Sequence, residues 1–130
     1  KVNMETLVVE DLQGEWGKKL EGHLKSDDFF SVDKFKESSI KTTSSTKKSD
    51  NFYEVQGVLT IKEISHPITF DVEVDGNLIN ANLTFDRSLY DVRFRSGSFF
   101  ENLGDKLIVD DIDLEVTLEL NWFVKYIPFP

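Results

Sequence analysis

Alternation of apolar and polar side chains is the feature that most limits how this chain can fold. In segments 53–61 and 67–74 every second residue is apolar or small, and the residues between them are mostly charged or hydroxylated. The same period of two returns in 79–85 and 112–122. A period of two places alternate side chains on one face of a strand. We therefore predict β-strands whose apolar faces line an enclosed space.

Turn signals between these segments indicate how the strands pair. Asp75-Gly76-Asn77 is a strong hairpin signal, and Ser65-His66-Pro67 is predicted to turn the chain before the second strand. Sequential hairpins imply antiparallel pairing, and closing such a sheet into a barrel removes its exposed edges. A barrel of about eight strands is either filled by side chains or holds one small ligand. The chain supplies only about six strands beyond an extended start at 1–6, so we expect further strands upstream of Lys1 or from a partner chain.

A helical pattern precedes the strands. Leucine or tryptophan recurs every four residues at positions 12, 16, 20 and 24, which predicts a helix from about Asp11 to Leu24. Ser26 and the aspartates after it favour the start of a second, short helix that carries Phe29 and Phe30. The polar stretch 42–50 predicts a strand end that runs into a solvated loop. The predicted fold is mainly β, an antiparallel barrel with one medium and one short helix near the N-terminus.

Composition excludes several classes of function. The 24 acidic and 15 basic residues give a net charge of −9, which repels nucleic acid and the anionic surface of most membranes. No cysteine is present for disulfides, thiolate metal sites or redox chemistry, and two histidines cannot build a multi-histidine site. The aspartates at 110, 111 and 113 lack the central glycine and distal glutamate of a calcium loop. We expect no metal and no cofactor, and no apolar run is long enough for an integral membrane segment.

Several motifs, taken in order, resemble the YceI-like family. They are Asn3-Met4-Glu5-Thr6, the stretch 20–30 with its Gly22-His23-Leu24-Lys25, and the segment 57–62 leading to His66-Pro67-Ile68-Thr69-Phe70. The stretches 85–92 and 110–116 resemble it too, so that the resemblance covers roughly Val2 to Leu120. The chain departs from the family at Glu63 and Asp91, where glycine is common, and residues 123–130 have no match. The family's first strands are also absent from the chain.

The resemblance implies a lipocalin-like barrel that binds polyisoprenoid or similar long-chain amphiphiles, in proteins usually exported to the bacterial periplasm. It also implies one domain at 1–122, followed by a C-terminal extension at 123–130. We therefore expect a periplasmic or secreted protein whose partner is an apolar or amphiphilic small molecule of isoprenoid, quinone or fatty-acid type. A homodimer is left open.

Each candidate site residue has a structural interpretation beside the functional one. His23 is either a hydrogen-bonding residue at a helix end or a contact for a ligand headgroup, and Lys25 either pairs with an anionic head or complements a helix C-terminus. Arg87 is either a rim cation that orients a polar head or a surface partner of Asp86. Tyr90 and Phe94 lie with two basic residues in the aromatic segment 89–101, which we interpret as a mobile lid or barrel mouth, because the net negative charge argues against a nucleic-acid site there. The remaining candidates belong either to the core or to the ligand lining, which are one face in a barrel: Phe29, Phe30, Leu59, Phe70, Leu83, Phe85 and Val116.

The sequence favours a binding module over an enzyme. Glu115 and Glu119 share one face, but that face is predicted to point into solvent, where paired carboxylates gain no catalytic tuning. No nucleophile elbow, phosphate loop or zinc helix occurs. The alternative, from a different class, is a structural or protein-interaction β-domain with a solid core.

Overall fold

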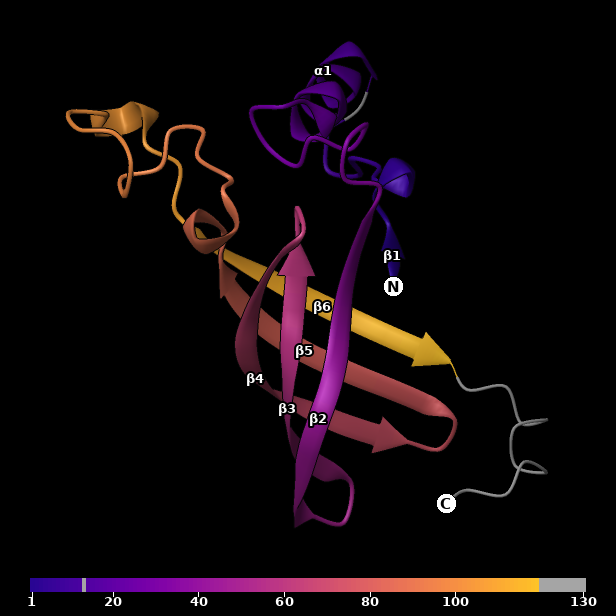
Figure 1. Ribbon diagram of the computed structural model, residues 1–130. Coiled ribbons are helices and arrows are strands. Elements are labelled where there is room, and N and C mark those ends of the chain that lie inside the picture. Colours follow the sequence, from indigo (N-terminus) through magenta and orange to yellow (C-terminus); the bar gives the residue numbers. More distant parts are fainter. Residues whose placement is uncertain (13, 120–130) are drawn as a thin grey trace.

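The computed structural model in Figure 1 describes residues 1–12 and 14–119. Within these residues the chain forms a six-stranded antiparallel sheet in the order β1-β2-β3-β4-β5-β6, one α-helix and three short 3-10 turns. The strands are β1 (Val2–Asn3), β2 (Glu37–Ser49), β3 (Phe52–Ile61), β4 (Ile64–Asp75), β5 (Leu78–Asp86) and β6 (Asp111–Glu119). The helix is α1 (Gly14–Lys25), and the turns are η1 (Met4–Thr6), η2 (Arg87–Tyr90) and η3 (Gly104–Lys106).

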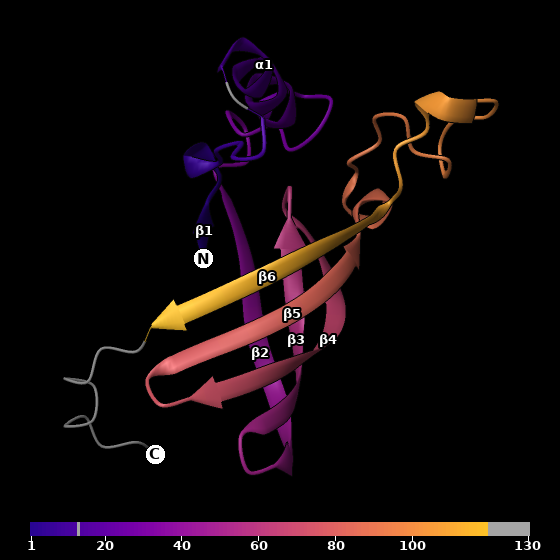
Figure 2. The same ribbon diagram turned by 180° about the vertical axis from the view of Figure 1, so that it is seen from behind.

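The sheet is curled into a half-barrel because β4 takes part in both of its halves. It pairs with β3 from Ile64 to Glu73, but with β5 only from Asp71 to Asp75. The strands β5 and β6 therefore run across β2 and β3 in both views (Figures 1 and 2). No ladder between β1 and β6 closes the curl within the described residues. The predicted antiparallel, lipocalin-like architecture is confirmed in this half-barrel form.

The hairpin between β3 and β4 corrects one prediction. Ser65, His66 and Pro67 lie inside β4, and the turn is Lys62-Glu63, whose φ angles are 53° and 63°. Two successive positive φ values are what a tight two-residue hairpin requires, and the signal was missed because neither residue is glycine. Pro67 is tolerated since this half of β4 pairs with β3 alone. The hairpin predicted at Asp75-Gly76-Asn77 is confirmed.

A second correction concerns the polar stretch 42–50, which the sequence predicted to leave the sheet. Strand β2 instead continues to Ser49 and pairs with β3 along its length, with irregularities at Thr42/Ser44 and Lys47/Ser49. Residues 41–49 are all exposed. A strand that is exposed to solvent on both faces needs no alternation of apolar and polar residues. The sequence of such a strand therefore resembles that of a loop, and only the threonines, which favour extended backbone, indicate a strand here.

The helical predictions are only partly correct. The helix begins at Gly14 rather than Asp11, and Leu12 and Trp16 are 45% and 72% exposed, so only Leu20 and Leu24 of the predicted stripe are partly buried. Phe29 and Phe30 lie in a turn, because the amides of Phe30 and Val32 donate to the last carbonyls of α1 instead of starting a new helix. The short helical element near the N-terminus is η1.

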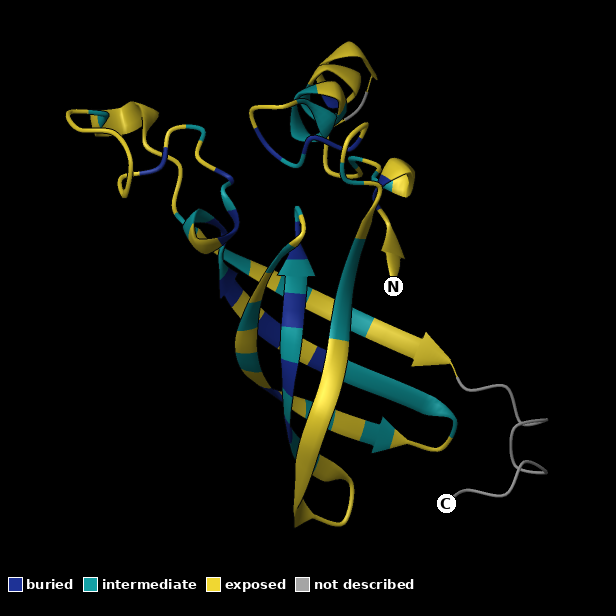
Figure 3. Cartoon of the chain, in the orientation of Figure 1, coloured by how far each residue is buried: buried dark blue, intermediate teal, exposed yellow. Residues whose placement is uncertain are grey.

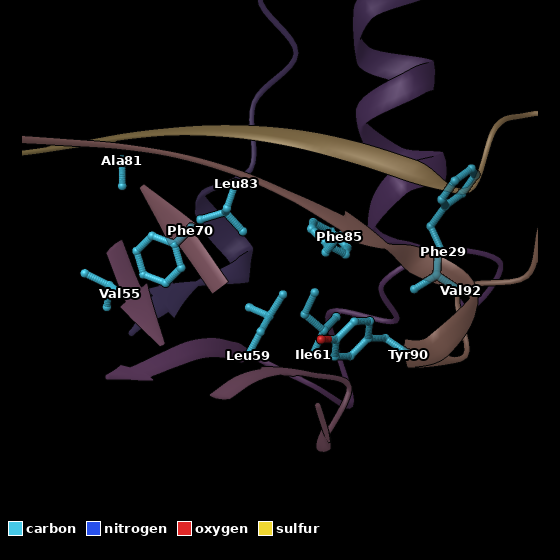
Figure 4. Packing of buried hydrophobic residues seen from close by; sticks show 10 residues of the cluster. All are labelled: Phe29, Val55, Leu59, Ile61, Phe70, Ala81, Leu83, Phe85, Tyr90 and Val92. Carbon is cyan, nitrogen blue, oxygen red and sulfur yellow. The ribbon is translucent and has the colours of Figure 1, made fainter. Parts of the chain in front are cut away.

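The core lies on the inner face of the curl. Figure 3 shows that buried residues occur on β3, β4 and β5, and Figure 4 shows their side chains facing one another, with Phe29, Tyr90 and Val92 at one end. Four residues of β5 were predicted to point inward: Ala81, Leu83 and Phe85 are buried, and Ile79 is half-buried. Among the described residues, no helix combines the length and apolarity that crossing a membrane requires. The predicted inward Leu120 and Trp122 and the domain boundary at 122/123 lie outside the described residues.

Two glycines provide a matched test of the β2–β3 contact. A Cβ atom at Gly57 would lie 2.7 Å from the carbonyl oxygen of Lys41 on β2, whereas one at Gly22 in α1 would meet nothing within 4 Å. We expect Gly57→Ala to lower the free energy of unfolding by roughly 1–3 kcal/mol through this clash. Gly22→Ala should raise it by about 0.5–1 kcal/mol, because alanine loses less backbone entropy in a helix. Urea unfolding followed by circular dichroism measures both, and equal midpoints for the two variants would contradict the expectation.

Candidate ligand-binding site

The candidate site is the apolar inner face of the half-barrel together with the aromatic residues at one of its ends. Strands β3, β4 and β5 supply its buried part, and β6 continues it with half-buried side chains at 112, 114 and 116. Leu118, next along β6, is 54% exposed. The inner face is therefore closely packed near β3 and open along β6. The strand residues predicted for the lining all lie on this face: Leu59, Phe70, Leu83, Phe85 and Val116.

Three aromatic rings meet at the end of the half-barrel that faces α1, here called the mouth. The His23 ring stands edge-on to Phe29 and Phe94, with ring centroids 5.0 Å and 4.5 Å away. Phe29 and Phe94 are 5.5 Å apart, and Phe30 lies 6.5 Å from Phe29. Such edge-on and tilted arrangements are favourable for aromatic rings. Phe94, in the β5–β6 connection, thus contacts His23 of α1 and Phe29 just after it, although these residues lie 65 or more positions away in the sequence.

His23 lies in the last turn of α1, and its Nε2 is 3.3 Å from a carboxylate oxygen of Asp28. Its side chain is 35% exposed. The imidazole therefore fixes the turn that follows the helix and presents its ring to the mouth. These contacts match the structural interpretation of His23, and the exposed third leaves room for a polar group of a ligand.

Lys25 and Tyr90, two other predicted residues, lie apart from this aromatic contact. The Lys25 ammonium lies 3.8 Å from the Glu21 carboxylate one helical turn earlier. Tyr90 is 2% exposed and packs edge-on against Phe85 and His66, with centroids 5.8 Å and 5.1 Å away. Burial raises the pKa of the Tyr90 hydroxyl. Whether these side chains contact a ligand stays a prediction.

Arg87 is the most deeply buried charged residue among those described, with 1% exposure. Its Nε donates to the Val109 carbonyl, and its Nη atoms donate to the carbonyls of Val92, Phe94 and Ile108 at 2.8–2.9 Å. Burial lowers the pKa of the guanidinium, and the charges of Asp110 and Asp86 oppose this. Its side chain also covers one face of Phe29, 5.7 Å from the ring centroid. Arg87 therefore lies inside the β5–β6 connection rather than on the surface or at the rim.

Asp110 completes this buried network. The hydroxyls of Ser96 and Ser98 donate to its two oxygens, and one oxygen lies 3.8 Å from Arg87 Nη2. These two hydrogen bonds, and then the Arg87 charge, lower the pKa of the Asp110 carboxyl. Sequence reasoning treated Asp110 only as a possible calcium ligand and missed Ser96. The usable signal was an arginine within an otherwise apolar strand end, because such a charge needs buried partners.

A crevice of about 760 Å³ borders the apolar face, because Phe70, Leu83 and Leu114 of that face form part of its lining. It opens where β4 and β5 diverge, and its rim carries Glu54, Asp71, Asp113, Glu115 and Lys48. Lys48 already pairs with Glu54 and Asp71 at 3.0 Å and 3.7 Å. Charged side chains and part of the apolar face therefore line this crevice together.

The fold and the inner face define a lipocalin-like half-barrel with an apolar lining and an aromatic mouth. The YceI-like domain model matches residues 2–120. A UPF0312 protein of Staphylococcus aureus is 30% identical over 112 residues, which cover 78% of this chain and 61% of the relative. The chain belongs to the YceI-like family, as the sequence motifs indicated.

Solved structures show the same fold. The Campylobacter jejuni YceI protein has a TM-score of 0.66 at 23% identity, covering 80% of this chain and 63% of that protein. Burkholderia cenocepacia BcnA has a TM-score of 0.65 at 19% identity, covering 80% and 65%. The chain thus spans less than two thirds of the length of each of these relatives.

Replacing Arg87 should open the connection that it holds. In Arg87→Met the four carbonyls lose a charged donor that methionine cannot replace, so we expect a loss of roughly 3 kcal/mol or more in unfolding free energy. Arg93→Met is the matched control, since Arg93 is 59% exposed and pairs with Asp91 at the surface, where such pairs contribute about 1 kcal/mol or less. Equal losses in chemical denaturation would contradict the structural role of Arg87.

The lowered pKa of Asp110 predicts a pH dependence of stability. A carboxyl whose pKa is lower in the folded than in the unfolded state stabilises the fold above its unfolded pKa of about 3.9, and this contribution is lost as pH falls through the folded value. We expect wild type to be more stable than Asp110→Asn at pH 6, with the difference shrinking below about pH 4. Thermal unfolding at a series of pH values measures it, and Asp105→Asn, an exposed change of equal charge, is the control. A constant difference between pH 6 and pH 2.5 would refute the prediction.

Proposed function

We propose that the half-barrel binds a long-chain apolar or amphiphilic molecule along its inner face. The observation that carries this proposal is the partly open apolar stripe of β6, where Val116 is half-buried and Leu118 is 54% exposed beside a buried core. A ligand chain lying there would cover side chains that the protein itself leaves in contact with water. Membership in the YceI-like family supports the proposal, because that family is one of binding proteins and is not a known enzyme family.

The driving force is removal of the ligand chain from water. Each buried methylene contributes on the order of 0.8 kcal/mol, which is about fourfold in affinity. The binding is passive and requires no cofactor. Affinity should therefore rise with chain length until the chain extends beyond the stripe, and isoprenoid, quinone and fatty-acid-like molecules all fit this description.

A polar head would lie at the mouth, where His23 offers a partly exposed ring. Lys25 is also partly exposed, although Glu21 faces its ammonium. Arg87 takes the role of a positioning residue, since its hydrogen bonds hold Phe94 against His23 and Phe29. We place this activity in the periplasm or outside the cell, on the basis of family membership.

The second candidate is a structural or protein-interaction β-domain without a ligand. The close packing of the core favours it, because ten hydrophobic residues, from Phe29 to Val92, are 9% exposed or less and pack together. In that case the open stripe of β6 would be covered by protein. The two candidate functions differ in whether the purified protein contains a bound lipid or quinone.

Organic extraction of the purified protein, followed by mass spectrometry, should release a long-chain lipid or quinone at near-stoichiometric amount. The extract should be depleted in Val116→Asp, which puts a charge on the inner face, and unchanged in Thr117→Asp on the exposed face of the same strand. Melting temperatures of both variants separate lost binding from lost folding. A lipid-free extract of wild type, combined with no binding of fatty acids of increasing chain length, would favour the second candidate.

A further inference from the structure

Large apolar side chains are exposed around the mouth of the half-barrel. They come from two segments that project beyond the same end of the sheet, the region of α1 and the β5–β6 connection at 91–110 (Figures 1 and 2). Figure 3 shows much of both segments as exposed. The mouth patch consists of Leu12, Trp16, Phe99, Phe100, Leu107 and Val109, which are between 41% and 72% exposed.

Cations accompany the aromatic rings of this patch. The Lys19 ammonium lies 4.8 Å from the centre of the Trp16 ring, and the Arg93 guanidinium lies 4.5 Å from that of Phe99. A ring beside a long basic side chain suits a membrane interface, because the ring enters the apolar layer while the cation stays among the headgroup phosphates. An apolar protein interface offers no such layer of phosphates.

Charge is distributed so that this end can approach a bilayer. Residues 37–86 and 111–119, which form most of the sheet, contain twelve acidic and four basic residues, whereas 87–110 contain four of each. Most of the negative charge therefore lies on the sheet, whereas residues 1–36, which carry Leu12 and Trp16, contain eight acidic and six basic residues. An anionic membrane would still repel the whole molecule, but a zwitterionic one would not.

The connection that carries four of the six patch residues is held in place by hydrogen bonds. The Ile108 amide donates to the Arg95 carbonyl at 2.9 Å, and the Phe100 amide donates to the Ser96 carbonyl at 3.0 Å. With the Arg87 hydrogen bonds beneath, these contacts present Phe99 and Phe100 in an ordered arrangement. Little conformational entropy is then lost when a surface covers them.

We propose that the mouth patch docks the protein on a zwitterionic lipid bilayer, with the acidic strands directed away from it. This docking rests on the exposure of the patch residues and on the distribution of charge along the chain, and it does not depend on ligand binding. The apolar inner face of the half-barrel begins at the same end of the sheet as the patch. Docking there would place the apolar lining next to the acyl layer.

The test is flotation of lipid-extracted protein with phosphatidylcholine vesicles. Wild type should float with the vesicles, and Phe99→Ser/Phe100→Ser should reduce the bound fraction at least fivefold. Phe52→Ser is the matched control, since Phe52 is 46% exposed at the start of β3, toward the opposite end. In a Trp122→Phe background, Trp16 emission should move to shorter wavelength on binding. Adding phosphatidylglycerol should weaken binding at low salt.

Three results would overturn the proposal: no flotation of wild type, equal loss in Phe52→Ser, or self-association through the patch without vesicle binding. Melting temperatures verify that the double variant is folded. Binding of a fatty-acid probe without vesicles should be unchanged in the double variant, so failure of docking and failure of the proposed ligand binding are measured separately.

Discussion

The buried guanidinium of Arg87 holds together the side of the mouth that the β5–β6 connection forms. From η2, directly after β5, it binds carbonyls at both ends of the connection to β6, near residues 92–94 and 108–109. One side chain thus closes a loop of about twenty residues, whose ordering would otherwise cost considerable backbone entropy. The start of β6, the place of Phe94 and the presentation of Phe99 all depend on this closure.

A buried charge is stabilising only when its partners are complete. Arg87 meets four carbonyls and the Asp110 carboxylate, and Ser96 and Ser98 in turn satisfy that carboxylate. No buried side-chain nitrogen or oxygen among the described residues is left without a hydrogen bond. Such a network specifies one arrangement of the connection, since any other would leave a charge in an apolar setting. The same network holds Phe94 against the side of α1.

The strands were predictable from the sequence where one face of the strand is buried and the other is exposed to solvent. In β3 and β5 the alternation identified the strands and their inward residues, because burial on one face repeats every second residue. It failed for β2, whose polar residues 41–49 are exposed on both faces, and for the Lys62-Glu63 turn, which contains no glycine. Arg87 was recognised as unusual, but its partners are backbone carbonyls, which leave no mark in a sequence. The resemblance to the YceI-like family predicted the architecture, whereas the contact between the rings of His23 and Phe94 was not predictable from the sequence.

The short ladder between β4 and β5 has a consequence for the shape of the lining. Only five residue pairs join these strands, against ten between β3 and β4 and nine between β5 and β6. Each half is therefore stiffer than the joint between them. A change in the angle between the two halves would widen or narrow the space along the inner face while both longer ladders stay intact. The width of the proposed ligand site can therefore change without loss of strand pairing.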